Sequence, residues 1–195
     1  MSVLRRPSIA VVVLLLVAGS VACGGDDADS SGTSVPDTAA TTTTAGVSET
    51  PATPTEGTLP GGATITYPSS WTSYGAGFAG SLELGIPGVA NVSVRDAAAS
   101  EYLYGPQLPD AASLEEAFGM MAAAMGSAEV GEAEQVTVDG EDVLTASVDN
   151  AGKDGVMAVM ASGDSYASLY AESLGDPLTD DTIEAALEVL ASLTP

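Results

Sequence analysis

A sharp change of composition divides this chain of 195 residues. All nine aromatic residues lie at or after position 67, whereas residues 24–60 consist almost entirely of Thr, Gly, Ser, Pro, Ala and a few acidic residues. A segment without large apolar side chains cannot bury enough surface to offset its loss of conformational entropy. We therefore expect a disordered tether at residues 23–60. One folded domain is expected at residues 61–195, a size that needs no disulfide or metal to hold its core.

The first 22 residues have the three-part layout of a bacterial export signal. Arg5 and Arg6 precede an unbroken apolar run at residues 9–17, and small residues follow it. A membrane-spanning helix needs about 20 apolar residues, and this run is shorter even when it is extended to Ala22. The sequence therefore predicts a signal peptide at residues 1–22 that is removed on export.

The single cysteine of the chain, Cys23, stands directly behind this signal. Its position after Ser20-Val21-Ala22 resembles the lipobox of bacterial lipoproteins, in which the cysteine is acylated and becomes the first mature residue. The resemblance implies a lipid anchor at Cys23 and a place on the outer face of the cytoplasmic membrane. The same three residues also satisfy the small-x-small rule of ordinary signal peptidase, which would leave a secreted protein. A single cysteine allows no internal disulfide.

The charge of the chain excludes several classes of function. There are 27 acidic residues against four basic ones and no histidine, which gives a net charge of −23. Nucleic acids are bound through clustered cations, so a nucleic-acid partner is excluded. Without histidine, the usual general base and the commonest metal ligand are missing. We therefore expect a protein that is not an enzyme and has no catalytic residues, no cofactor and no metal site.

Two short motifs are similar to functional sites but lack part of their chemistry. Gly163–Ala167 places Ser165 at a sharp turn, as in some hydrolases, but this serine has no evident base. Asp149–Gly155 carries oxygen ligands and glycines, as calcium loops do, but Ala151 and Lys153 occupy ligand positions. The sequence favours a plain turn in the first case and a polar hairpin loop in the second.

Hydrophobic periodicity predicts an α+β fold of five to seven strands and two helices. The second half describes an antiparallel meander, and its member at residues 156–161 does not alternate, which predicts a central strand covered on both faces. One helix follows Asp110 or Ser113, and a closing helix follows the cap residue Thr179. Strands are expected at residues 63–67, 81–84, 89–94, 135–138, 143–148, 156–161 and 166–171.

The order of these elements resembles that of the PsbP-like family. The similarity covers residues 63–193 and includes a first strand that ends in Tyr-Pro-x-x-Trp, formed by Tyr67, Pro68 and Trp71. That family has an α/β/α sandwich around an antiparallel sheet, and it includes photosystem extrinsic subunits and many lipoproteins of actinobacterial type. The resemblance implies non-catalytic binding or accessory work. Together with Cys23, the tether and the lack of histidine, it leads to the hypothesis of a lipid-anchored module that binds an envelope protein or a glycan.

Aromatic side chains are the candidate interaction residues. Trp71 and two tyrosine pairs could line a recognition surface, but the simpler interpretation is that they pack beneath a helix with their hydroxyls at the rim. An alternative function is a carrier of a small apolar or lipid ligand in a pocket between helix and sheet. Methionines 120, 121 and 125 would then line the pocket, but core filler is the simpler interpretation. The pairs are Tyr102 with Tyr104 and Tyr166 with Tyr170.

Overall fold

The computed structural model describes residues 53–195. The predicted signal peptide at residues 1–22, the predicted lipidation site Cys23 and most of the predicted tether lie outside the described residues. The elements in chain order are β1 (Thr55–Thr58), β2 (Thr64–Tyr67), β3 (Thr72–Ala76), β4 (Leu82–Ile86), β5 (Ala90–Arg95), α1 (Ala97–Tyr104), α2 (Leu114–Ala124), β6 (Glu129–Val130), β7 (Glu134–Val138), β8 (Glu141–Asn150), β9 (Lys153–Ser162), β10 (Ser165–Ser173) and α3 (Asp180–Ala191).

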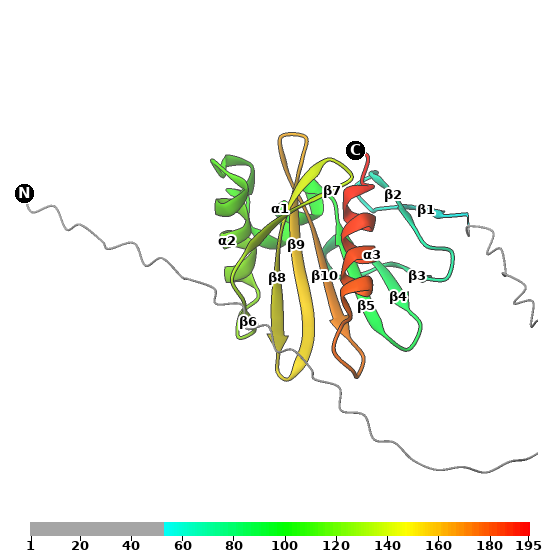
Figure 1. The fold of residues 1–195 in the computed structure, drawn as a ribbon. Helices are drawn as coiled ribbons and strands as arrows, with labels where there is room; N and C mark the ends of the chain where they lie inside the picture. The colour runs from blue at the N-terminus through cyan, green and yellow to red at the C-terminus, as the bar shows by residue number, and fades with distance from the viewer. Residues whose placement is uncertain (1–52) are drawn as a thin grey trace, which may run out of the picture. The chain divides into compact units, whose positions relative to one another are not determined.

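An eight-stranded antiparallel sheet forms the centre of the domain (Figure 1). Its strand order is β3-β4-β5-β10-β9-β8-β6, and β7 also pairs with β8, on the edge that β6 occupies farther along. The strands β7 to β10 follow one another as hairpins, which confirms the predicted meander. The hairpin β1–β2 is a separate two-stranded sheet.

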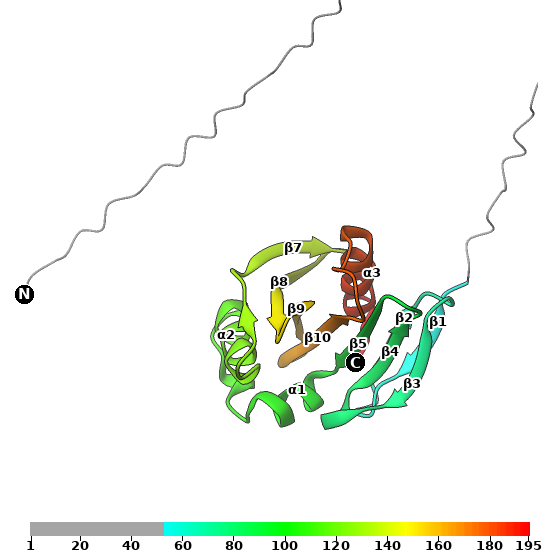
Figure 2. The same cartoon turned by 90° about the horizontal axis from the view of Figure 1, so that it is seen from below.

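Helices cover both faces of the sheet (Figure 2). α3 and the β1–β2 hairpin pack on one face in a first core cluster, and α2 packs on the other face in a second. β9 supplies side chains to both, because Val156, Ala158 and Met160 belong to the first cluster and Met157 and Val159 to the second. The predicted central strand and the α+β class are therefore confirmed, and residues 53–195 have a complete core of their own.

The predicted caps begin α2 and α3. The Ser113 side chain accepts a hydrogen bond from the Glu116 backbone N–H at 3.3 Å, and Thr179 accepts one from Thr182 at 3.3 Å. Each cap satisfies a backbone donor that has no partner inside the helix. No helix of residues 53–195 is long and apolar enough to cross a membrane.

The ordered domain begins inside the segment that we predicted to be tether. Residues 55–58 form β1, which pairs along its whole length with β2, and Leu59 is only 2% exposed. Its amide donates to the Ala63 carbonyl at 2.8 Å. The boundary at residue 60 is corrected to about residue 54, because one leucine and backbone pairing hold a segment whose composition alone predicted disorder.

The structure also contains more elements than the sequence predicted. There are three α-helices and ten strands in residues 53–195, against the two helices and five to seven strands expected. α1 occupies the stretch around Tyr102 and Tyr104, for which the sequence predicted neither a helix nor a strand. Asp96 caps it by accepting a hydrogen bond from Ala99 at 2.9 Å. α1 buries only small side chains, Ala99 and Ser100, so it has no apolar stripe for a periodicity analysis to detect.

Candidate functional site

The face of the sheet that carries α1 and α2 is covered only in part. α2 lies against β8 and β9, and α1 lies against β10 and β5. The side-chain oxygens of Ser100 in α1 and Ser168 in β10 are 3.1 Å apart, which places α1 over the row that Ser168 shares with Arg95. Farther along β5, Asn91 is exposed. The helical layer therefore ends before Asn91.

A row of four paired residues crosses this open part. Gly85 of β4 pairs with Asn91 of β5. Asn91 pairs in turn with Glu172 of β10, and Glu172 pairs with Gly155 of β9. Side chains paired across strands point to the same face. Because neighbouring strands are about 4.8 Å apart, the two glycines at the ends of the row are separated by about 14 Å.

Each terminal glycine of the row lies beneath a tyrosine ring. A β-carbon added at Gly85 would lie 2.5 Å from the hydroxyl oxygen of Tyr74 and 2.7 Å from its Cε2. A β-carbon added at Gly155 would lie 3.2 Å from Cε2 of Tyr170. Aromatic side chains are known to cover strand glycines in this way. Tyr74 is 64% exposed, so its ring presents a supported flat surface to solvent.

Glu172 is the centre of a polar network between the two rings. Its Oε1 accepts a hydrogen bond from Nζ of Lys153 at 2.6 Å, and this contact is also an ion pair. Its Oε2 accepts hydrogen bonds from the Tyr170 hydroxyl at 3.1 Å and from Nδ2 of Asn150 at 3.3 Å. Three strands contribute to the network, so the Glu172 carboxylate and the Tyr170 ring are held in fixed positions.

This network shifts the pKa values of two groups in opposite directions. Burial, together with the charge and the hydrogen bond of Glu172, raises the pKa of Tyr170 to about 12. For Glu172, burial acts to raise the pKa, but hydrogen bonds from Lys153, Tyr170 and Asn150 and the charge of Lys153 lower it overall. At neutral pH the site therefore holds a neutral phenol that donates a hydrogen bond to an ionised carboxylate.

A second carboxylate lies in the neighbouring row of the same face. Glu83 of β4 pairs with Ser93 of β5, and the Ser93 hydroxyl donates to Glu83 Oε2 at 2.6 Å. The Ser81 hydroxyl donates to the other oxygen of Glu83. Each oxygen of this carboxylate thus has a hydroxyl partner, which fixes its orientation.

We call this surface the tyrosine face. Its composition of tyrosine, asparagine and serine with two oriented carboxylates is typical of recognition surfaces, because the rings provide rigid contact area and the polar groups provide hydrogen bonds. Val89 and Leu174 are 37% and 54% exposed at its border, where the Leu174 amide donates to the Val89 carbonyl. The tyrosine face consists of Tyr74, Glu83, Asn91, Ser93, Asn150, Lys153, Tyr170 and Glu172.

The five aromatic residues named from the sequence do not form one surface. Trp71 is 9% exposed in the first core cluster, whereas Tyr104, Tyr166 and Tyr170 pack against the second, on the opposite face. The Tyr166 hydroxyl donates to the Ala111 carbonyl at 3.3 Å. Tyr102 is 80% exposed on α1. Of the five, Tyr170 alone belongs to the tyrosine face. The indole of Trp71 is part of the core.

Most of the tyrosine face was not predicted from the sequence. Tyr74 lies in β3, where a register shift between Ser73 and Gly75 interrupts the pairing with β4. That shift breaks the alternation by which a strand is recognised. Asn91, Ser93 and Glu83 alternate with buried neighbours, and this alternation was the one available signal for a polar sheet face.

The hydrolase-like motif spans the turn between β9 and β10, and the calcium-like motif spans the turn between β8 and β9. Ser165 is buried at the start of β10, and its hydroxyl has no hydrogen-bond partner in the described residues. In the other motif, Asp149 accepts a hydrogen bond from the Gly152 amide at 2.7 Å, and Asp154 accepts one from Leu178 at 2.9 Å. Residues 53–195 contain no group of three or more His, Cys, Asp or Glu that could hold a metal ion.

Methionines 120, 121 and 125 pack in or against the second core cluster. Met121 is fully buried in the second cluster with Phe118, Met157 and Val159. Met120 and Met125 are partly buried against the same cluster. The carrier hypothesis needs space for a ligand between helix and sheet. In this part of the domain, side chains fill that space.

Comparison with known proteins identifies similar folds only. No protein-family model and no curated protein matches the chain. The solution structure of the cyanobacterial PsbP protein CyanoP from Synechocystis sp. PCC 6803 is similar, with 15% sequence identity and a TM-score of 0.41, and the match covers 73% of this chain and 92% of that one. A PsbP protein, a member of the family that the sequence resembles, is thus among the structures with a similar fold.

A second similar structure comes from another bacterium. It is a crystal structure from Bacteroides thetaiotaomicron VPI-5482, with 15% identity and a TM-score of 0.35. The match covers 68% of this chain but only 44% of the Bacteroides chain, so this chain spans less than half of that protein.

Proposed function

We propose that this protein is a lipid-anchored extracytoplasmic binding module that recognises a neutral glycan of the cell envelope through the tyrosine face and catalyses no reaction. The lipid anchor is assigned to Cys23, from its position behind the export signal. The remainder of the proposal rests on the geometry of the tyrosine face.

The observation that carries the glycan assignment is the pair of supported tyrosine rings with polar groups between them. A sugar ring has faces of C–H groups that stack on an aromatic ring and a rim of hydroxyls that need hydrogen bonds. Tyr74 offers the first kind of contact, and Asn91 and Glu172 offer the second. The separation of about 14 Å between the supporting glycines exceeds one sugar ring, so the ligand class is an oligosaccharide.

Charge restricts which glycan is bound. Residues 53–195 carry 22 acidic side chains against two basic ones, a net charge of −20. Such a domain repels polyanions. The tyrosine face itself contains Glu83 and Glu172 and a single cation, Lys153, which is already paired. A neutral glycan satisfies the hydrogen-bonding groups without this repulsion.

The anchor is tested by metabolic labelling with radioactive palmitate. We expect the label to enter the wild-type chain and to be absent from Cys23→Ser. Equal labelling of both chains, or no labelling of the wild type, would contradict the anchor, and it would leave the glycan proposal to its own test.

Glycan binding is tested by calorimetry on residues 53–195 with cellohexaose, maltohexaose and chitohexaose as probes. We expect at least one probe to bind, and Tyr74→Ala to weaken that binding by about tenfold through loss of the stacking surface. Asn91→Ala should also weaken it, through loss of hydrogen bonds. Tyr102→Ala is the matched control, because Tyr102 is exposed but lies on α1 outside the tyrosine face, and it should bind normally.

A glycine substitution separates ring position from ring chemistry. In Gly85→Ala the new methyl group collides with the Tyr74 ring, so the ring must move although every side chain of the tyrosine face is retained. We expect binding to weaken as in Tyr74→Ala. No binding of any probe by the wild type, or normal binding by Tyr74→Ala and Gly85→Ala, would refute the proposed function.

A further inference from the structure

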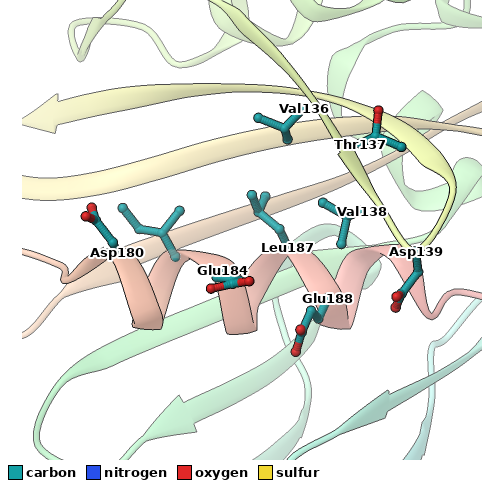
Figure 3. A pocket seen from close by; sticks show the side chains of 9 residues that line it. Val136, Thr137, Val138, Asp139, Asp180, Glu184, Leu187 and Glu188 are labelled. Carbon is teal, nitrogen blue, oxygen red and sulfur yellow. The ribbon is translucent and has the colours of Figure 1, made fainter.

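A groove runs along α3 on the other face of the sheet. Its central hollow, of about 450 Å³, lies between α3 and β7 (Figure 3). A second hollow, of about 430 Å³, shares Asp139 and Glu188 with it. A third, also of about 430 Å³, shares Ile183 with the first. All three hollows adjoin α3, a helix of 12 residues or about 18 Å, and we call them together the α3 groove.

The central hollow has an apolar floor. Val136 and Val138 of β7 and Ile183 of α3 are partly buried, and Leu187 is buried. Figure 3 shows Val138 and Leu187 facing each other from β7 and α3, and both line the hollow. Covering these side chains with an apolar group is favourable, because it removes apolar surface from water.

Carboxylates border this floor, and none of the described residues that line the central hollow is basic. Asp180, Glu184 and Glu188 follow one another at intervals of four residues, so they form a stripe along one side of α3 (Figure 3). Like charges at this spacing destabilise a helix. Asp139 stands across the hollow at the end of β7. The third hollow adds Glu132, Glu134 and Asp154.

The two basic residues of the described chain lie elsewhere. Arg95 is 7% exposed in β5, and Lys153 is paired with Glu172 on the tyrosine face. Neither lines any of the three hollows. The segment at residues 24–52 contains acidic but no basic residues, so it cannot supply the missing charge. A second copy of this acidic domain cannot supply it either.

We propose that the α3 groove binds a basic amphipathic helix of a partner protein. The apolar stripe of such a helix covers Val136, Val138 and Leu187, while its lysines and arginines face the carboxylates on both sides. An apolar groove that receives a helix through anchors at i, i+3 or i+4 and i+7 is a common mode of peptide recognition. Anchors from i to i+7 span about two turns, or about 11 Å, which is shorter than α3 itself.

The test uses residues 53–195 and a 14-residue peptide in which lysine alternates with leucine and alanine at helical spacing. A second peptide of the same composition has its order changed so that the helix has no apolar face, and a third carries glutamate in place of lysine. Binding is measured by fluorescence anisotropy at low and at physiological salt. We expect only the first peptide to bind tightly, with weaker binding at the higher salt concentration.

Two pairs of variants locate the site. Glu184→Gln with Glu188→Gln removes two charges from the groove, and we expect about a tenfold loss of affinity. Glu101→Gln with Asp164→Asn removes two charges outside the groove and is the matched control, with expected affinity within twofold of the wild type. Val138→Thr changes the floor at nearly constant volume and should weaken binding about threefold.

Three results would overturn the proposal. The first is equal loss of affinity in the groove and control variants, which would indicate diffuse attraction to the whole acidic surface. The second is equal binding of the peptide without an apolar face, and the third is no binding at low salt. The tyrosine face takes no part in this experiment, so its outcome is independent of the proposed function.

Discussion

At the scale of single residues, Tyr170 joins the core to the tyrosine face. Its ring packs against the second core cluster and covers Gly155, while its hydroxyl donates to Glu172. The same residue thus contributes to folding and to the tyrosine face. The hydroxyl must stay protonated for this hydrogen bond to persist, and the raised pKa extends the protonated state to well above neutral pH.

The Tyr170–Glu172 pair predicts how stability depends on pH. A phenol whose pKa is about 12 in the folded state and near 10 in the unfolded state contributes stability that is present below about pH 10 and is lost as the pH rises to about 12. We expect the free energy of unfolding to fall in this pH range, and to fall less in Tyr170→Phe than in the wild type. Tyrosinate absorbance should show one late step that Tyr170→Phe removes and Tyr102→Phe retains.

Glu172 predicts the opposite dependence in acid. Its pKa is lowered in the folded state, so its contribution is present above its unfolded pKa of about 4.3 and is lost as the pH falls through the folded value. In Glu172→Gln, denaturant unfolding should show a smaller loss of stability between neutral pH and acid than in the wild type. An unchanged acid dependence in Glu172→Gln would show that the pair is not coupled to folding.

At the scale of elements, the β1–β2 hairpin closes the first core cluster. Its connecting loop contributes Leu59, and Ile65 and Tyr67 follow in β2. The chain end is tied down at the same place, because Thr64 and Thr194 exchange backbone hydrogen bonds of 2.8 Å in both directions. The hairpin therefore links the start of the described chain to its end.

Leu59→Ala tests this role. Removing a fully buried leucine side chain costs about 3 kcal/mol, from lost transfer free energy and from the cavity that remains. We expect that loss in urea unfolding of residues 53–195. Leu174→Ala is the matched control, because Leu174 is 54% exposed and its truncation should change stability by less than about 0.5 kcal/mol. Similar effects of both variants would mean that β1 is not part of the cooperative domain.

Elements with strong periodicity were predictable, and elements held by other means were not. The seven strands and two helices expected from alternation and caps all have counterparts, and the unbroken apolar run of β9 correctly indicated burial on both faces. β1 was not predicted because it is held by pairing with β2 and not by an apolar pattern. α1 was not predicted because the residues that it buries are small. The tyrosine face was not predicted for a related reason. Its residues come from strands that are distant in sequence, and strand pairing brings them into one row that no local pattern encodes.

At the scale of the whole molecule, the two proposed surfaces lie on opposite faces of one sheet. The tyrosine face lies beside α1 and α2, and the α3 groove lies on the side of the first core cluster. A glycan on one face leaves the other free for a protein partner. If both proposals hold, neither ligand blocks the other.

Charge acts on the molecule as a whole. Residues 53–195 carry 22 acidic and two basic side chains, and the ion pair between Lys153 and Glu172 is the one that this part of the chain forms. Folding brings these acidic side chains closer together, so their mutual repulsion opposes the compact state more than the unfolded one. At 0.1 M, added salt screens repulsion between charges that are more than about 10 Å apart. The attraction that the same salt weakens comes from only one ion pair. The domain is therefore expected to be stabilised by salt.

Thermal unfolding in sodium chloride measures this effect. Between about 0.01 M and about 0.15 M salt, we expect a gain of about 1 kcal/mol, which corresponds to a rise in Tm of roughly 3 to 5 °C for a domain of this size. Magnesium chloride at equal ionic strength is the control, and screening alone predicts the same rise. A larger rise with magnesium would instead reveal a divalent-cation site among the carboxylates. A Tm that stays constant or falls with sodium chloride would show that the acidic side chains are too far apart, or too well hydrated, for their repulsion to affect folding.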